Sequence, residues 1–217
     1  MIVHLIRHGQ AYNTHREPGE PYPANPPLTP VGVRQAERLA ERMKRLPIDR
    51  VVSSPMLRSI ETATIVGRAI GRPVEVWARC YEYRAQPGYL CWGAREVLAR
   101  YPELIVPEDF GPDDWPYGEE PLEQAIERAR AFVAWLRDMA GAGHVKQLAV
   151  VAHGGFTRLV LAQVLDVELA RLEPIVVDNT SLTTLRVDGA GFRVLALNDS
   201  AHLCGAGAAD ALAGIAR

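Results

Sequence analysis

Two short apolar runs of this chain each end in a histidine that is followed by glycine. The first run, residues 2–6, leads into Arg7-His8-Gly9, and the second run, residues 148–152, leads into His153-Gly154. If both runs are parallel strands of an open α/β sheet, the two histidines lie together at its carboxyl edge, where such sheets bind ligands. Two imidazoles beside a guanidinium suit chemistry on a phosphate group, because that chemistry needs the phosphate oxygens positioned and their charge neutralised.

A further cationic group, Arg58, is expected in the first turn of a helix that follows another short strand. The guanidinium groups of Arg7 and Arg58 offer fork-shaped donors whose charge does not titrate away. Their positive field disfavours the imidazolium form of His8 and lowers its pKa, which leaves a lone pair free for attack on phosphorus. Because cationic and donor groups of this kind can replace a metal, we expect neither a metal ion nor a cofactor.

The leaving alkoxide of such a reaction needs a proton, and a carboxylic acid is the most plausible donor. Glu82 is our candidate, and it lies in the run Arg79-Cys80-Tyr81-Glu82-Tyr83. In a second step the same group, now a carboxylate, would activate the incoming water.

The alternation of strand-like and helix-like segments predicts one α/β domain that spans residues 1–217. Its expected architecture is a three-layer αβα sandwich with a mainly parallel central sheet. We expect strands at residues 2–6, 50–53, 74–77 and 148–152, a hairpin of 181–187 with 192–197, and helices that begin at Thr29-Pro30, Ser54-Pro55, Pro121 and Phe156. In the first of these helices, Val33, Ala36, Leu39, Ala40 and Met43 form the apolar stripe.

The segment from about residue 78 to residue 120 interrupts this alternation. Its periodicity is weak apart from a short helical stretch at residues 93–100, and it holds most of the aromatic residues of the chain. We interpret it as a lid-like insertion over one end of the sheet. Its aromatic residues either select an apolar leaving group or form the small core that the insertion needs.

Composition limits the classes of partner. The chain has 217 residues and a net charge of −2, without a Lys and Arg cluster of the kind that binds nucleic acid. No stretch approaches the ~20 apolar residues of a membrane span, and no secretory leader is recognisable. The three cysteines lack CxxC spacing, which argues against a disulfide framework and a zinc site. We expect a cytoplasmic protein without nucleic-acid or membrane partners, and a homodimer is compatible with the sequence.

Four blocks of the sequence, in order, resemble the histidine phosphatase (phosphoglycerate mutase-like) superfamily. They are residues 5–10 with the Arg-His-Gly motif, residues 27–36, residues 53–63 and residues 151–155. A single Arg-His-Gly motif is a weak signal, whereas four ordered blocks over most of the chain are a specific one.

The resemblance implies a role for each of the residues singled out above. His8 is the phosphorylated nucleophile, while Arg7, Arg58 and His153 form the phosphate pocket. Glu82 falls at the position of the general acid.

Further positions carry over from the same resemblance. An asparagine often follows the Arg-His-Gly motif; here Asn13 comes one residue early and Thr14 takes the common place. The residues that the resemblance places beside the substrate are therefore Gln10, Asn13, Thr14 and Gly154. Asn179 and His202 match positions that buttress the pocket.

Three functions are compatible with these residues. The first is a phosphomonoesterase that acts on a small phosphorylated metabolite. The second is a phosphoglycerate mutase, which uses the same covalent step, although the basic, glycine-containing run that follows the acid in mutases is absent after Glu82. The third is a non-catalytic phosphate-binding protein that keeps the fold. The sequence does not identify the natural substrate.

Overall fold

A six-stranded, mostly parallel sheet with helices on both faces organises the computed structural model, which describes residues 1–13, 24–83, 90–113, 115–116 and 120–204. The strands of this sheet are β1 (Ile2–Arg7), β2 (Arg50–Ser53), β3 (Val74–Val76), β6 (Gln147–Ala152), β7 (Leu182–Asp188) and β8 (Gly191–Asp199). The α-helices are α1 (Pro30–Met43), α2 (Leu57–Ile70), α3 (Ala94–Arg100), α4 (Leu122–Ala142) and α5 (Gly154–Leu165). The predicted αβα architecture is confirmed.

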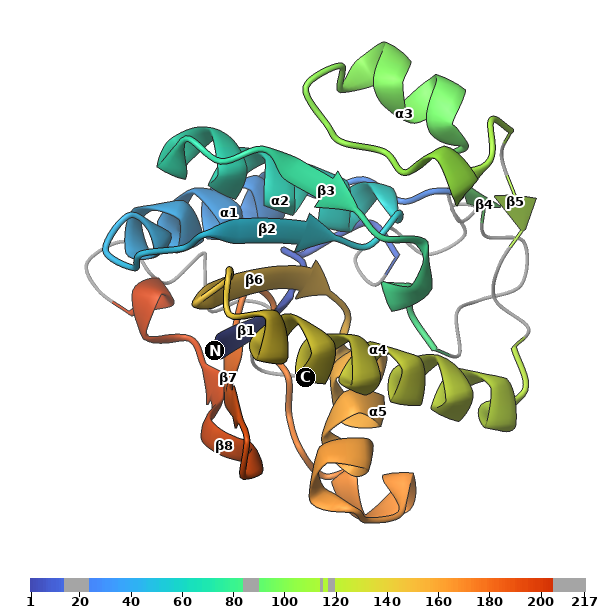
Figure 1. Ribbon diagram of the computed structural model, residues 1–217. Coiled ribbons are helices and arrows are strands. Elements are labelled where there is room, and N and C mark those ends of the chain that lie inside the picture. Colours follow the sequence, from blue (N-terminus) through green and yellow to red (C-terminus); the bar gives the residue numbers. More distant parts are fainter. Residues whose placement is uncertain (14–23, 84–89, 114, 117–119, 205–217) are drawn as a thin grey trace.

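The strand order is β3-β2-β6-β1-β7-β8, in which β3, β2, β6 and β1 are mutually parallel and β7 runs antiparallel to both of its neighbours. Helix α1 carries the chain from β1 towards β2, and α5 carries it from β6 towards β7, on opposite faces of the sheet (Figure 1). The neighbouring strands β1 and β6 therefore form a switch point, where an open α/β sheet leaves a crevice at its carboxyl edge.

Strict alternation along the central strands builds two apolar cores. Val3 and Leu5 of β1 pack with α4 and α5, whereas Ile6 packs with α1 and α2. Strand β6 divides in the same way, with Val150 in the first core and Val151 in the second. Buried on both faces, these strands are the continuous apolar runs expected of a parallel sheet.

Local signals fix where the helices begin and end. The hydroxyl of Thr29 accepts a hydrogen bond from the N–H of Gly32 at 3.1 Å and caps α1, while Pro30 occupies its first turn. Helices α2 and α4 end at Gly71 and Gly143, whose φ angles of 66° and 73° favour glycine.

Three details differ from the expectations. Val33, expected in the stripe of α1, is exposed, and Gly32 and Gln35 are buried instead. Helix α2 begins at Leu57, with Met56 as its N-cap, rather than at Ser54-Pro55. Helix α5 begins at Gly154, two residues before the expected Phe156.

The segment from residue 78 to residue 120 holds short elements. They are the 3₁₀ helices η1 (Ala78–Cys80) and η2 (Glu108–Phe110), helix α3, and a two-stranded sheet of β4 (Leu90–Cys91) with β5 (Trp115–Pro116). Figure 1 shows α3, β4 and β5 on the side towards which β2 and β6 point. That this segment is an insertion covering the active site stays a prediction, as does the single-domain assignment.

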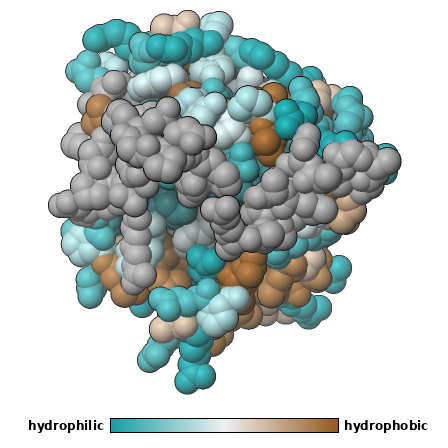
Figure 2. Space-filling view, turned by 180° about the vertical axis from the view of Figure 1, so that it is seen from behind, coloured by the Kyte–Doolittle hydropathy of each residue, from teal (hydrophilic) through white to brown (hydrophobic). Residues whose placement is uncertain are grey.

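The surface is mixed in character. On the face seen in Figure 2, hydrophilic residues dominate the upper edge, and apolar residues gather in the lower half among hydrophilic ones. Within the described ranges, none of the helices combines the length and the apolar character that crossing a membrane requires.

Gly32 brings the first turn of α1 into backbone contact with the loop after β1. A Cβ at this position would lie 2.0 Å from the carbonyl oxygen of Gln10. We predict that Gly32→Ala lowers the free energy of unfolding by about 1–3 kcal/mol, the usual cost of overpacking. Urea unfolding checks this, with Gly189→Ala as the control because a Cβ there meets nothing within 4 Å. Equal stability of the two variants would contradict the expectation.

Candidate active site

His8 and His153 leave neighbouring strands at the same level of the sheet. Arg7 and Ala152 are the last paired residues of β1 and β6, so each histidine is the next residue along its strand. The His8 N–H donates to the carbonyl of Ala152 at 3.0 Å, and the two ring centroids are 5.1 Å apart. Both side chains are buried, with 3% and 0% of their surface exposed. The sheet register therefore creates the predicted pair.

The ring of His8 is held by the backbone that follows it. Its Nδ1 lies 2.6 Å from the carbonyl oxygen of Gly9, an acceptor, so Nδ1 carries the proton. Nε2 is then an unprotonated lone pair, and the Nε of Arg58 donates to it at 3.1 Å. Thr62 fixes the loop by accepting the Gly9 N–H at 3.1 Å, and the Asn179 amide donates to the His8 carbonyl at 2.9 Å. The nucleophile candidate is thus neutral and oriented.

Burial is the main reason that His8 stays neutral. It lowers the pKa of His8 well below the usual value of 6.5, the charges of Arg58 and Arg7 lower it further, and the hydrogen bond to Gly9 opposes them. The charges of the two arginines, the cause expected from the sequence, contribute less than desolvation.

His153 is the second neutral imidazole. Burial and the charge of Arg58 lower its pKa well below 6.5. The hydroxyls of Ser54 and Ser59 lie 2.7 Å and 3.4 Å from its Nε2, and a hydroxyl can donate its own proton to a ring nitrogen. With Nε2 as acceptor, the ring proton resides on Nδ1, which is buried and has no hydrogen-bond partner among the described residues. A phosphate oxygen would supply that acceptor.

Arg7 completes the cationic group. Its Nη1 donates to the carbonyl of Val177 at 2.6 Å, and Gly154 lies beside its side chain. Burial lowers the pKa of Arg7, and the nearby carboxylates of Glu82 and Asp178 act in the opposite direction. The structure therefore brings Arg7, His8, Arg58, His153, Gly154 and Glu82 into one region.

The Glu82 carboxylate lies at the first turn of α5. Its Oε1 accepts the N–H groups of Tyr83 at 2.8 Å and Phe156 at 3.0 Å, while Oε2 accepts the Gly155 N–H at 3.1 Å. A helix N-terminus favours a carboxylate in this position. A Cβ on Gly155 would come within 2.5 Å of Oε1, so this approach requires glycine.

Three further residues, Gln10, Asn13 and Thr14, are predicted to lie beside the substrate. The Gln10 side chain is buried, and its Oε1 accepts the Thr29 hydroxyl proton at 2.7 Å, which ties it to the cap of α1. Asn13 is half-buried, and its Oδ1 has no partner among the described residues. Thr14 lies outside the described residues. Contact of these three residues with a substrate stays a prediction.

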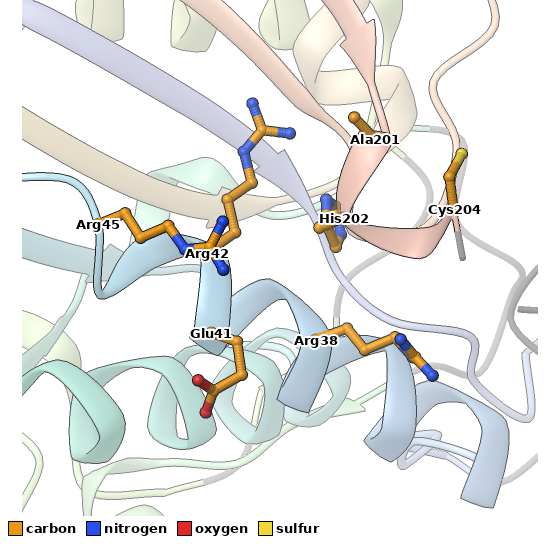
Figure 3. A pocket seen from close by; sticks show the side chains of 7 residues that line it. All are labelled: Arg38, Glu41, Arg42, Arg45, Ala201, His202 and Cys204. Carbon is orange, nitrogen blue, oxygen red and sulfur yellow. The ribbon is translucent and has the colours of Figure 1, made fainter. Parts of the chain in front are cut away.

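His202 is connected to Arg7 through Thr180. It lies in η4 (Ala201–Leu203), its Nε2 is 3.0 Å from the Thr180 hydroxyl, and the Thr180 N–H donates to the Arg7 carbonyl at 2.9 Å. Burial, with Arg42, lowers the pKa of His202 to about 4. It also lines a separate cavity of about 430 Å³ between α1 and η4, and Figure 3 shows the side chains that line this cavity. That His202 buttresses the pocket, as the resemblance implies, stays a prediction.

The other histidines with described positions have ordinary surroundings. His4 is buried in β1, with Thr184 and Gln147 within hydrogen-bond distance of its two ring nitrogens, and His144 is exposed. In the described part of the chain, no group of three or more His, Cys, Asp or Glu residues is arranged to hold a metal ion. Metal independence itself stays a prediction.

Sequence reasoning missed several supporting residues. Ser54, Thr62 and Gly155 act on His153, Gly9 and Glu82 through contacts that join distant segments. Only Gly155 carried a local signal, since it doubles the glycine after His153.

Comparison with known proteins agrees with this geometry. The sequence profile described as the histidine phosphatase superfamily (branch 1) matches residues 3–200. Over 183 residues the chain is 27% identical to phosphoserine phosphatase 1 of Hydrogenobacter thermophilus, and this alignment covers 82% of this chain and 83% of that protein. A stretch of 69 residues is 41% identical to the probable phosphoglycerate mutase GpmB of Proteus mirabilis, covering 31% of each chain.

A solved structure has the same fold. The phosphoserine phosphatase mutant of Entamoeba histolytica in complex with phosphoserine superposes with a TM-score of 0.65 at 19% identity. The superposition covers 94% of this chain and 99% of that one.

The buried imidazoles predict that stability falls on acidification. Below about pH 6.5, His8 and His153 bind protons in the unfolded chain but stay neutral in the folded protein. Each of these two histidines therefore lowers the free energy of unfolding by up to about 1.4 kcal/mol for every pH unit of acidification. Urea unfolding at pH 7.5 and pH 5.0 measures the loss. It should be smaller in His153→Gln than in the native protein and unchanged in His144→Gln, whose histidine is exposed. The same loss in all three proteins would refute neutral burial of His153.

Proposed function

Because the chain belongs to the histidine phosphatase superfamily, we propose that it hydrolyses a phosphate monoester of a small metabolite through a phosphohistidine intermediate. The observation that carries this proposal is the orientation of His8. Its Nδ1 proton is committed to the Gly9 carbonyl, and its unprotonated Nε2 faces the guanidinium of Arg58 in a buried site. A lone pair held among permanent cations suits attack on an anionic phosphoryl group.

In the first step, Nε2 of His8 forms a bond to phosphorus while the bond from phosphorus to the ester oxygen breaks on the opposite side. The phosphoryl oxygens take over the donors that surround the nucleophile, namely the guanidinium groups of Arg7 and Arg58 and the Nδ1–H of His153. Such donors act most strongly where water is excluded; Arg58 and His153 are buried, and Arg7 is half-buried. Their charge compensates the three equatorial oxygens of the transferred group.

Glu82 supplies the proton that the leaving alkoxide requires. Its Oε2 accepts one N–H among the described residues, that of Gly155, and so retains a lone pair that can carry a proton. In the second step, the Glu82 carboxylate takes a proton from water as the water oxygen attacks phosphorus. The bond from phosphorus to Nε2 then breaks, and inorganic phosphate leaves.

The substrate class is a small phosphorylated metabolite. Relatives named phosphoserine phosphatase make phosphoserine the first compound to test. The partial match to a probable phosphoglycerate mutase keeps isomerisation of 3-phosphoglycerate as the alternative. The two activities differ in whether water or a second hydroxyl group receives the phosphoryl group from His8.

We predict hydrolysis of p-nitrophenyl phosphate in the presence of EDTA. Replacing the nucleophile in His8→Ala should lower kcat on the order of 10⁴-fold or more. His144→Ala, which removes an exposed imidazole, should keep the native rate. Phosphate binding without turnover by the native protein would favour a non-catalytic role, and loss of activity in EDTA would contradict metal independence.

We predict that acid-labile, base-stable phosphate becomes attached to His8 during turnover. Glu82→Gln should form this intermediate from 2,4-dinitrophenyl phosphate, whose leaving group needs no proton. The rate at which water hydrolyses the intermediate should fall by about 10²–10⁴-fold in this variant. Rapid quenching with labelled substrate measures how fast the intermediate forms and is hydrolysed, and mapping of the labelled peptide identifies the residue that carries it. Steady hydrolysis without a labelled peptide would refute the covalent step, and rapid interconversion of phosphoglycerates with little free phosphate would favour the mutase.

A further inference from the structure

We propose that Arg128 of α4 is a positioning residue that holds Glu82 where it can protonate the leaving group. This inference rests on the proposed function and extends it to a side chain that does not touch the phosphate site. Arg128 is nine-tenths buried, although it carries a full positive charge. A buried charge is costly unless it is fully paired, so its partners indicate what it does.

The first partner of Arg128 is Glu120. Nε and Nη2 of the guanidinium donate to the two carboxylate oxygens at 3.0 Å and 2.6 Å, and both side chains are buried. This fork-to-fork geometry fixes the plane of the guanidinium as well as its distance from the carboxylate. The Tyr81 hydroxyl also donates to Glu120 at 2.9 Å, so a residue next to the proposed acid joins the same cluster.

The remaining donor atom of Arg128 acts on the backbone that leads to Glu82. Nη1 donates to the carbonyls of Arg79 and Tyr81, each at 2.9 Å. The guanidinium also lies over the Tyr81 ring, 3.7 Å from its centroid. The chain is thereby held on both sides of Cys80 and up to the residue before the acid.

Arg128 also reaches the element that receives the carboxylate. Its guanidinium lies 5.5 Å from the centroid of the Phe156 ring, and the N–H of Phe156 is one of the donors to Glu82. One side chain therefore joins the segment that carries the acid to the helix turn that holds it. Lysine cannot reproduce this arrangement, because an ammonium group lacks the planar fork and the flat face.

A purely structural role of Arg128 and a positioning role predict different effects of its replacement on kcat/KM. An acid matters for kcat/KM when the leaving alkoxide is strongly basic and hardly matters when the leaving group is a stable phenolate. We therefore compare β-glycerophosphate with 2,4-dinitrophenyl phosphate, using kcat/KM because it reports the step in which the ester bond breaks.

We expect Arg128→Lys to lower kcat/KM for β-glycerophosphate by about 10–100-fold, a fraction of the effect of losing a general acid. The value for 2,4-dinitrophenyl phosphate should fall less than about threefold, and inhibition by vanadate should be unchanged. In a Glu82→Gln background, Arg128→Lys should have no further effect on β-glycerophosphate, because both changes remove the same contribution. The matched control is Arg130→Lys on the same helix, where the arginine is exposed and pairs with Glu127.

The outcomes separate the two proposals. If Glu82→Gln itself slows both substrates equally, the assignment of the acid is wrong and the inference fails with it. If Glu82→Gln is selective for β-glycerophosphate but Arg128→Lys slows both equally or neither, only the positioning role is refuted. Should Arg128→Lys not fold, Tyr81→Leu tests the same contact by removing the stacked ring. It should produce a smaller loss with the same selectivity, and a loss without selectivity would overturn the proposal.

Discussion

An uncharged imidazole buried among permanently charged guanidinium groups is the constraint around which this molecule is built. Arg7 and Arg58 repel a proton on His8, and burial disfavours the imidazolium form even more strongly. The same burial would be costly for the arginines without acceptors. Arg7 has the Val177 carbonyl and lies near the carboxylates of Glu82 and Asp178, while Arg58 uses the Nε2 lone pair of His8. A phosphate group fits this balance because it brings negative charge and several acceptors at once.

The sheet topology explains how residues far apart in the sequence come together at the site. His8 and His153 follow adjacent parallel strands whose register is fixed up to the preceding residue. Helix α5, which starts directly after His153, contributes the backbone donors that hold Glu82. Its first turn thus joins the phosphate side of the site to the proposed acid. Arg128 extends that connection to the segment before Glu82.

Much of this could be predicted from the sequence, for identifiable reasons. Apolar runs that end in His-Gly, the Thr29-Pro30 cap and the helical periodicities are local signals, and they gave the sheet, most of the helices and the cluster of Arg7, His8, Arg58 and His153. The contact of Ser54 with His153 could not be predicted, because the two residues lie 99 positions apart in the sequence. The apolar periodicity predicts that Val33 faces inward, whereas Gly32 takes the buried position through backbone contact. The proposed role of Arg128 depends on partners from three separate segments, at residues 79–81, Glu120 and Phe156, which no local pattern reveals.

The central claim is the protonation state of His8, and nitrogen NMR of protein labelled in its histidine rings measures it most directly. With the resonance assigned by its loss in His8→Gln, we predict a protonated Nδ1 and an unprotonated Nε2 that persist from pH 7.5 to pH 5.5. An imidazolium at His8 near pH 6, or a neutral ring with its proton on Nε2, would contradict the account.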